Sequence, residues 1–517
     1  MNISVKRLGL PRYQEILDHW EQNLDTDALT YRGRHIWPVV KILYHMYTKS
    51  PHPIDLSAEP AAAFMEPPDL NEHLIFTAQY GKLAQQFLEE MSKHRVFDHL
   101  SPCDVLLVSE SVNAYATLEG KRFDPFLDSL YYMFNDTYRF HKVEITVPPD
   151  TPPRWLEPVY IDPTAFVGMM DKLDAYRDSL ASDSSGHRVE GYSAFKDSQR
   201  DTLGEVMIGE EAVINFVRHV EALSRLFKMI YRHTRPRLVL VVDYASRFNV
   251  AACKAASEMG IPCADVQHGA AGGGRYNFKW SWHHMPPGGY GLLPRYFWVW
   301  GDRTREMMMG DRPPPDQYHK AIVGGHPWLT LWKDEKFIKR HGKLPAELES
   351  RLSGATKSIL VTLPNAIETM DFDLLAETMT RAPKDWLWLV RLHPTDINET
   401  ERYEALLMDR LQTADSRNLE ITIATQANLA VLLRRVNVHL TDNSSACFDA
   451  LEFGVPTVFF GSLGVEVFSE YLDDEVFQTA HNADELLTAI ESPRPAAHSF
   501  ISTSRKQAEK ALKRMLV

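Results

Sequence analysis

The segment from Thr441 to Gly461, TDNSSACFDALEFGVPTVFFG, constrains the fold of this chain more than any other. It predicts an apolar strand at Val438 to Thr441, a helical stretch, a Gly-Val-Pro turn and a second apolar strand at Thr457 to Phe460. Strands that alternate with helices are typical of a parallel, doubly wound sheet. The segment therefore predicts an α/β protein.

The polar residues between the first strand and the helix predict an anion site. Asn443, Ser444 and Ser445 lie where the helix would begin. The unpaired N–H groups and the positive dipole end of a helix favour a bound phosphate there. Asp449 follows Ser445 by four residues, so both would face the same side of the helix. A phosphate on the serines and a ribose on Asp449 would make a nucleotide site; a Ser/Asn helix cap is the alternative interpretation.

A second strand end is expected at the same site. Residues Trp386 to His393, WLWLVRLH, form an apolar run that ends in His393-Pro394. In open α/β sheets, ligands bind beyond the carboxyl ends of the strands. A His at such a position can bind a phosphate or a sugar carboxylate. We therefore expect His393 and the serine pair to lie at one binding site.

The His-Pro pair, the Ser pair and the Gly-x-Pro turn, in this order and on these elements, resemble the nucleotide half of GT-B glycosyltransferases. The nearest resemblance is to bacterial sialyltransferases and Kdo transferases that use CMP-sugars. It implies that the His-Pro and Ser pairs hold the CMP. It also implies that Asp449, where many relatives carry Glu, holds the ribose, and that Arg391 meets the phosphate or the sugar carboxylate.

The N-terminal half carries further predicted strands that end in polar residues. The strand Arg237 to Val242 is followed by Asp243, and Val105 to Ser109 is followed by Glu110. A carboxylate at a strand end could be a general base or a nucleophile. Asp243 is the first choice and Glu110 the second, because Asp243 ends the most apolar strand. Capping of the helix that begins near Ser246 is the alternative for Asp243.

The next predicted strand, Ile261 to Val266, ends in Gln267-His268-Gly269. We expect His268 to lie beside Asp243 and to orient the acceptor or steady developing charge, and Gln267 to contact the donor. A long loop rich in glycine and aromatic residues follows, which suits a lid that stacks on carbohydrate. A loop that only packs its aromatics on the sheet is the alternative. The Gln-His-Gly motif with this loop also resembles surface-polysaccharide glycosyltransferases.

The two series of strands predict two domains. GT-B proteins have two Rossmann-like domains facing a central cleft. The resemblance thus implies an N-terminal acceptor and catalytic domain at 1–330 and a C-terminal nucleotide-sugar-binding domain at 331–517. The linker is expected between Lys333 and Ser350. Helices predicted near the N-terminus, such as Ala78 to His94, would decorate the first sheet. The final helix, Ser502 to Leu516, would cross back to the first domain.

Composition argues against several other classes of protein. A net charge of −13 argues against a general nucleic-acid binder. No apolar run is long enough for a transmembrane helix, and the first residues lack a signal core. The protein is therefore expected in the cytoplasm or at the inner face of the cytoplasmic membrane. Basic clusters, such as that of the final helix, could there contact anionic lipid head groups; solvated helix faces are the alternative.

Neither the cysteines nor the acidic motifs predict a metal site. The four cysteines show no C-x-x-C spacing and suit small buried thiols. The Asp-x-Asp motif Asp371-Phe372-Asp373 opens a predicted helix, and Asp371 is interpreted as its N-cap. GT-B enzymes offset phosphate charge with helix dipoles and basic side chains. We therefore expect no metal and no cofactor other than the nucleotide-sugar donor.

These observations predict a glycosyltransferase that moves a sugar onto a growing bacterial surface glycan, such as lipopolysaccharide or capsule. The expected donor is a CMP-activated ulosonic acid such as Kdo, and the expected acceptor is a glycan or glycolipid. A CDP- or UDP-activated donor is an alternative within this class. A UDP-sugar 2-epimerase on the same fold, and a non-catalytic GT-B relative that only binds carbohydrate or protein, are the alternatives outside it.

Overall fold

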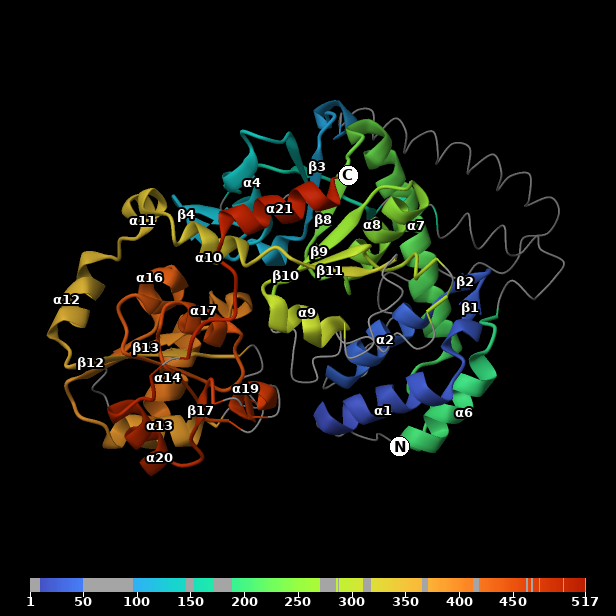
Figure 1. Cartoon of the computed structure of the whole chain (residues 1–517). Helices are drawn as coiled ribbons and strands as arrows, with labels where there is room; N and C mark the ends of the chain where they lie inside the picture. Colours follow the sequence, from blue (N-terminus) through green and yellow to red (C-terminus); the bar gives the residue numbers. More distant parts are fainter. Residues whose placement is uncertain are drawn as a thin grey trace.

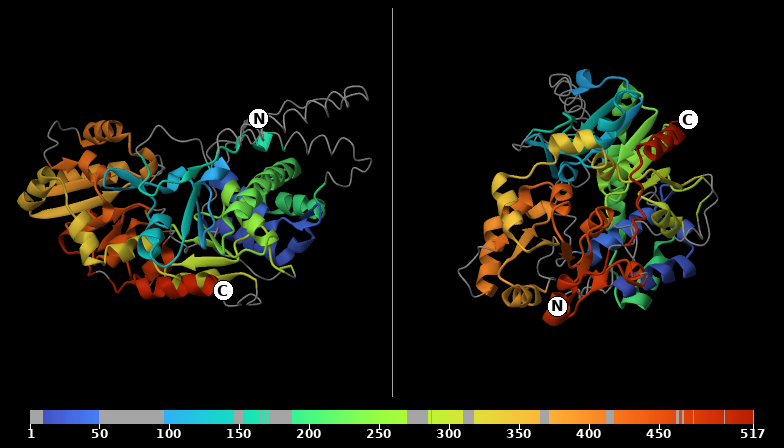
Figure 2. Two further views of the ribbon diagram at one scale, coloured as in Figure 1. Left: turned by 90° about the horizontal axis from the view of Figure 1, so that it is seen from above. Right: turned by 60° about the vertical axis from the view of Figure 1, so that its left-hand side comes forward.

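The computed structural model describes most of the chain and contains two large parallel β-sheets, one of seven strands and one of six. The sheets lie in separate halves of the molecule, each with helices packed around it (Figure 1, Figure 2). This confirms the predicted α/β fold with two Rossmann-like units, the GT-B arrangement. The described residues are 10–49, 96–145, 153–164, 166–168, 170, 188–269, 285–286, 288–309, 318–364, 371–411, 418–461, 464–465, 468–473, 475–495 and 497–516.

Both large sheets are doubly wound. The larger sheet contains β3 (Val105–Ser109), β6 (Phe140–Glu144), β7 (Val159–Tyr160), β8 (Leu238–Val241), β9 (Cys263–Val266), β10 (Tyr296–Val299) and β11 (Lys320–Val323). The smaller sheet contains β12 (Lys357–Thr362), β13 (Trp386–Arg391), β14 (Leu419–Glu420), β15 (Val438–Thr441), β16 (Thr457–Phe459) and β17 (Gln478–Thr479). Their spatial orders are β11-β10-β9-β8-β3-β6-β7 and β14-β13-β12-β15-β16-β17. The order reverses between β3 and β8 and between β12 and β15. Open α/β sheets bind ligands at such topological switch points.

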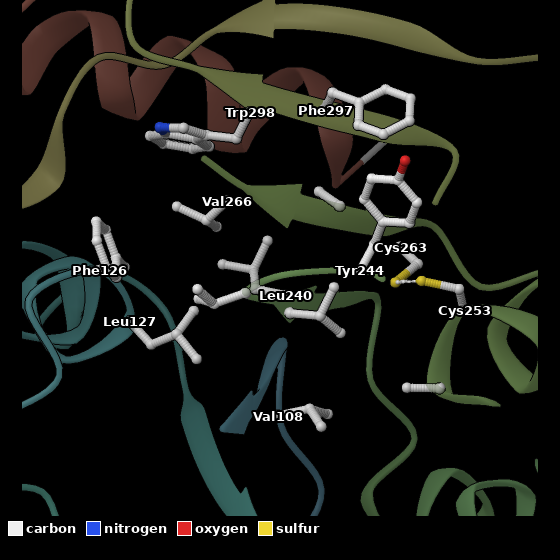
Figure 3. Packing of buried hydrophobic residues seen from close by; sticks show 14 of the residues in the cluster. Val108, Phe126, Leu127, Leu240, Tyr244, Cys253, Cys263, Val266, Phe297 and Trp298 are labelled. Carbon is white, nitrogen blue, oxygen red and sulfur yellow. Dashed lines mark hydrogen bonds between the residues drawn. The ribbon is translucent and has the colours of Figure 1, made fainter. Parts of the chain in front are cut away.

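The central strands form because their residues are continuously apolar, which suits strands buried on both faces. All residues of β3 and β8 are buried. Val108 of β3, Leu240 of β8, Val266 of β9 and Trp298 of β10 pack into one core (Figure 3). This core fixes the strand ends that carry the predicted site residues.

Strand β6, FHKVE, is not predicted from the sequence, because it carries charged residues that are unusual in a buried parallel strand. Its Lys142 donates to Asp128 of α4 (Leu127–Phe134) at 2.6 Å, and both side chains are fully buried. Its Glu144 accepts two hydrogen bonds from Arg154 at 2.7 and 3.0 Å. Because each charge has a buried partner, β6 lies in the sheet interior although its composition resembles a surface segment.

The N-terminal unit carries the predicted helical decoration. Helices α1 (Leu10–Asn23), α2 (Trp37–Lys49) and α6 (Tyr192–Leu203) lie beside the long helix α7 (Glu210–Thr234) at one side of the larger sheet (Figure 1). The predicted helix Ala78 to His94 lies outside the described residues. Within the described parts of the chain, every helix is too short or too polar to span a bilayer.

The connection between the two units is largely helical. It contains α10 (Pro327–Leu331), α11 (Glu335–His341) and α12 (Ala346–Gly354), and the last two overlap the predicted linker. The predicted boundary between 330 and 331 falls within α10 and stays a prediction.

The final helix, α21 (Arg505–Met515), crosses back to the larger sheet as predicted (Figure 1). Gln507 Nε2 donates to the carbonyl of Val323 at 2.7 Å, and an Arg237 guanidinium nitrogen donates to the carbonyl of Leu516 at 2.9 Å. The end of the chain therefore braces the N-terminal unit.

The sequence favours a strand at Leu419 to Ile423 in the C-terminal unit, and the structure corrects this prediction. Strand β14 ends at Glu420, because Glu420 Oε1 accepts the N–H of Ile423 at 2.7 Å and helix α15 (Thr422–Gln426) follows. Arg351 pairs with Glu420 and holds it in place. The helices around the smaller sheet are α13 (Phe372–Arg381), α14 (Thr400–Leu411), α15 (Thr422–Gln426), α16 (Leu429–Leu433), α17 (Ala446–Glu452), α19 (Ser469–Asp473) and α20 (Ala483–Glu491).

We predict that Lys142→Met lowers the free energy of unfolding by about 3–5 kcal/mol, since it leaves the Asp128 carboxylate buried without its cation. Urea-induced unfolding measures this change. The matched control is Arg200→Met, which breaks an exposed pair with Asp197 and should cost less than about 1 kcal/mol. Equal losses in the two variants would contradict the buried ion pair.

Candidate functional site

The carboxyl edges of the two sheets meet. Gly269 follows β9 of the larger sheet, and a Cβ built on it would lie 3.6 Å from Ser445 Oγ of the smaller-sheet unit. Burial raises the pKa of Tyr115, in the segment after β3, and the nearby charges of Asp449 and Arg391 in the C-terminal unit act on this pKa in opposite directions. The structure therefore brings the strand ends predicted in the two halves of the sequence to one interdomain region.

The two candidate carboxylates of the N-terminal unit lie together at its switch point. Glu110 directly follows β3, and Asp243 lies just beyond the adjacent strand β8. Glu110 Oε1 accepts hydrogen bonds from Ser246 Oγ at 2.5 Å and Asn249 Nδ2 at 2.9 Å. Burial raises the pKa of Glu110 to about 7; the Ser246 hydrogen bond opposes the shift and the nearby Asp243 charge adds to it. The carboxyl groups of Glu110 and Asp243 thus lie near each other.

Asp243 occupies a left-handed backbone conformation, with φ of 63°. Asp is one of the residues that best tolerates this region. The buried carboxylate of Asp265 in β9 supports the turn, because it accepts the N–H of Tyr244 at 3.1 Å. Ser246 caps the helix α8 (Arg247–Glu258) by accepting the N–H of Asn249. The alternative that Asp243 is the cap is therefore wrong: Asp243 lies in a constrained turn before the cap.

Gln267 and His268 directly follow β9, the strand next to β8. The His268 ring packs edge-to-face on Phe126, with 6.5 Å between ring centroids. Gln267 is buried; its Oε1 accepts the N–H of Trp300 at 2.8 Å and its Nε2 donates to the Gly269 carbonyl at 2.9 Å. Its amide thus ties β9 to β10, and its contact with a donor stays a prediction. Residues 270–284 of the aromatic loop after Gly269 lie outside the described residues, and Tyr290 near its end is buried.

The predicted phosphate and ribose residues lie around the start of α17. Ser445 is the residue before the helix, and the adjacent Ser444 Oγ accepts the N–H of Ala446 at 3.2 Å. The Ser444 N–H in turn donates to Thr441 Oγ1 at 3.1 Å, which ties the loop to β15. Asp449 lies in the first turn of α17. Burial raises the pKa of Asp449 to about 7, although the nearby Arg391 charge opposes this shift.

Arg391 and His393 come from the end of β13. Arg391 donates to the carbonyls of Ala424 and Ala427 at 2.7 and 2.5 Å and so closes the end of α15. Burial lowers the pKa of Arg391 to about 10, so it stays a cation at neutral pH. Burial also lowers the pKa of His393, which favours its neutral form, while Asp396 opposes the shift. Pro394 begins a short 3₁₀ turn.

Two residues of this region are absent from the predicted site. Asp442 follows β15 at the second switch point, and both of its carboxylate oxygens are buried. Burial raises the pKa of Asp442 to about 6. Its place at a strand end could have identified it by the same rule as Asp243. Tyr115 belongs to no motif, and only the tertiary structure brings it to Arg391 and Asp449.

The Asp-x-Asp motif has structural partners. Asp371 accepts the N–H of Leu374 at 2.9 Å, which confirms the predicted N-cap of α13, and Asp373 pairs with Arg410 at 3.2 Å. Across the residues that the structure describes, no three His, Cys, Asp or Glu side chains are grouped so as to hold a metal ion. Metal-independent chemistry stays a prediction.

No protein-family model matches the chain, and no curated protein matches it in sequence. Similar solved structures include the UDP-GlcNAc 2-epimerases of Methanocaldococcus jannaschii and Neisseria meningitidis, with 12% and 11% identity and a TM-score of 0.46 each. Both alignments cover 80% of this chain and 99% of the other. A UDP-glucosyltransferase from Polygonum tinctorium aligns with 14% identity and a TM-score of 0.39, over 81% of this chain and 93% of that chain. At these identities and scores the likeness carries no inference about what this chain binds.

We predict a pH-dependent stability difference between the wild type and Glu110→Gln. The Glu110 pKa is raised from 4.5 to about 7 in the folded protein, so folding takes up a proton between these values. The stability tied to this group is present below about pH 4.5 and is lost as the pH rises to about 7. Glu110→Gln has no ionisable carboxyl at this position, so its stability does not fall with pH in this way. Urea unfolding should show the variant gaining about 1–3 kcal/mol over the wild type between about pH 5 and pH 8. A pH-independent difference would contradict the buried carboxyl.

Proposed function

We propose that this protein is a glycosyltransferase that uses a nucleotide-sugar donor. The observation that supports it is the meeting of two switch points at one interdomain region. One side offers a carboxylate pair, Glu110 and Asp243, for acid–base or nucleophilic chemistry. The other offers hydroxyls, a helix start and a buried cation for a phosphate and a ribose. A transferase needs both functions on opposite sides of the reacting carbon.

The donor nucleotide binds the C-terminal side in this proposal. Ser444 and Ser445 hold the phosphate, Asp449 accepts from the ribose hydroxyls, and His393 donates to the phosphate from its neutral ring. Arg391 supplies a fixed positive charge. An anionic sugar such as a CMP-activated ulosonic acid suits this charge, because its carboxylate needs a cation in addition to that offsetting the phosphate. CDP- and UDP-activated sugars are the alternatives that a nucleotide screen separates.

The N-terminal side supplies the chemistry. If the configuration inverts, Asp243 removes the proton of the acceptor hydroxyl as its oxygen attacks the anomeric carbon, and the bond to the phosphate oxygen breaks to release the nucleotide. If the configuration is retained, Asp243 attacks the anomeric carbon and displaces the nucleotide, which leaves a covalent glycosyl–enzyme. The acceptor oxygen then loses its proton, attacks the same carbon and displaces the Asp243 carboxylate. Glu110 can hold a proton near neutral pH, because removal from water raises its pKa to about 7. His268 orients the acceptor.

The carboxylate pair also supports a second candidate function, a nucleotide-sugar 2-epimerase. Epimerisation needs one group that removes a proton from the sugar carbon and one that returns it to the other face, and an acid–base pair supplies these roles. The reactions differ in their need for an acceptor. Conversion of a UDP-sugar into its 2-epimer without any acceptor would favour the epimerase over the transferase.

We expect Asp243→Asn to lower turnover by about 10²–10⁴-fold, the scale of a lost general base, while donor affinity is largely kept. Steady-state rates and calorimetry measure the two quantities. Asp302→Asn, an exposed carboxylate on α9 (Asp302–Met309), is the matched control and should leave both unchanged. Turnover near the wild-type level in Asp243→Asn would move the role to Glu110 or remove it. Intact-mass spectrometry with donor alone tests for the covalent adduct.

The double change Ser444→Ala with Ser445→Ala should weaken nucleotide binding by about tenfold or more, because it removes hydroxyl donors to a phosphate. Calorimetry of the wild type with CMP, CDP, UDP and GDP identifies the preferred nucleotide. The affinities of the wild type and the double variant for that nucleotide are then compared. Ser353→Ala, an exposed serine of α12, controls for the loss of a hydroxyl. Wild-type affinity in the double variant, with an unchanged melting temperature, rules out the proposed phosphate site.

Turnover should survive chelation. The proposed mechanism uses helix N–H groups, hydroxyls and Arg391 to offset the phosphate charge, and none of its steps needs a metal. Rates measured before and after treatment with EDTA test this expectation. A complete loss of activity that added metal restores would contradict it.

A further inference from the structure

The outer face of α21 is strongly basic. Its apolar residues Ala508, Ala511, Leu512 and Met515 are buried against the N-terminal unit, whereas its basic residues are exposed. Arg505 also donates to the carbonyl of Met133 in α4. Two exposed arginines extend this face: Arg139, directly before β6, and Arg237, directly before β8. The basic surface is defined here as Arg505, Lys506, Lys510, Lys513 and Arg514 of α21 together with Arg139 and Arg237.

Contacts between the three segments make this surface continuous. Arg237, at the start of β8, donates to the carbonyl of Leu516 at the end of α21. Arg237 and Arg139 both flank Asp104, at 4.0 and 3.3 Å. Arg139, Arg237 and Lys513 expose 71%, 59% and 62% of their side chains. The basic surface is therefore open to solvent and not an internal ion-pair network.

The positive charge of the basic surface is only partly compensated. Two carboxylates form ion pairs within it: Asp104, which is mostly buried and shared by Arg139 and Arg237, and Glu509, which pairs with Lys513. Seven cationic side chains against two anionic ones leave an excess of five positive charges. The whole chain has a net charge of −13, so this excess of positive charge is concentrated on one face of a protein that is negative overall.

The side chains of the basic surface indicate which kind of partner it can bind. Val112, which lies outside this surface, is the one exposed large hydrophobic among the described residues, so the surface has no apolar wedge for insertion into a bilayer. It also presents no exposed aromatic ring on which a nucleobase could stack. A row of flexible cations on a rigid helix suits an array of phosphate groups. We propose that the basic surface docks the protein on the head groups of an anionic phospholipid membrane.

Docking through this face is compatible with the candidate site. α21 lies outside the larger sheet and packs along it (Figure 1). Glu110, Asp243 and Ser445 lie at the carboxyl edge instead, where the two sheets meet. The attraction is electrostatic and reversible, because each cation near an anionic surface contributes about a fivefold factor in binding and salt screens it.

The test is sedimentation of the full chain with vesicles of phosphatidylcholine alone and of an about 7:3 mixture with phosphatidylglycerol. The wild type should bind the anionic vesicles at about 50 mM salt and dissociate from them at about 500 mM salt. It should not bind the neutral vesicles at either salt concentration. The triple change Lys510→Gln, Lys513→Gln and Arg514→Gln should weaken this binding about a hundredfold. Gln has nearly the helix propensity of Lys and Arg, and an unchanged melting curve verifies that the variant folds.

The matched control removes the same number of positive charges from another part of the surface, with Lys336→Gln, Lys339→Gln and Lys343→Gln. It should keep the vesicle affinity of the wild type. Equal binding of the wild type and the α21 variant, equal loss in the control, or binding to neutral vesicles would each overturn the proposal. Binding to dextran sulfate without binding to anionic vesicles would also overturn it and would assign the surface to a soluble acidic glycan.

Discussion

In a parallel sheet every strand delivers its last residue to the same edge, and in a doubly wound sheet that edge opens where the strand order reverses. This chain applies the constraint twice. β3 and β8 present Glu110 and Asp243 at one switch point, and β15 presents Asp442 at the other. Helices α10 to α12 lead from one sheet to the other, and α21 returns. The close approach of Gly269 to Ser445 shows that the two edges meet. The candidate site depends on this pairing of edges more than on any single side chain.

Buried polar groups hold these edges and set their chemistry. A carboxylate removed from water prefers its protonated form, and this effect raises the pKa of both Glu110 and Asp449 to about 7. The same burial would be costly for Lys142 and Asp128, whose direct pairing offsets it. Asp265 supports the left-handed turn at Asp243 by accepting the N–H of Tyr244. Strain of this kind persists where the surrounding structure enforces it, which is common at functional sites.

The sequence predicts the parts of this structure that depend on local pattern. Continuous apolar runs predict β8, β13 and β15 because parallel strands are buried on both faces. The same rule misses β6, since the partners of Lys142 and Glu144 come from other elements. The strand-end rule finds Glu110 and Asp243, but it does not reveal that they form one pair. Tyr115 could not be predicted, because its neighbours Arg391 and Asp449 are brought to it only by the folding of two domains onto each other.

The most direct measurement of the central claim is hydrogen–deuterium exchange of the full chain with the preferred nucleotide alone and then with the complete nucleotide sugar. The nucleotide alone should slow exchange only around His393 and from Thr441 to Asp449. The nucleotide sugar should add protection around Glu110 and Asp243, because the sugar reaches the facing edge. Protection by both ligands confined to one unit, or located away from the two switch points, would contradict a shared site between the sheet edges.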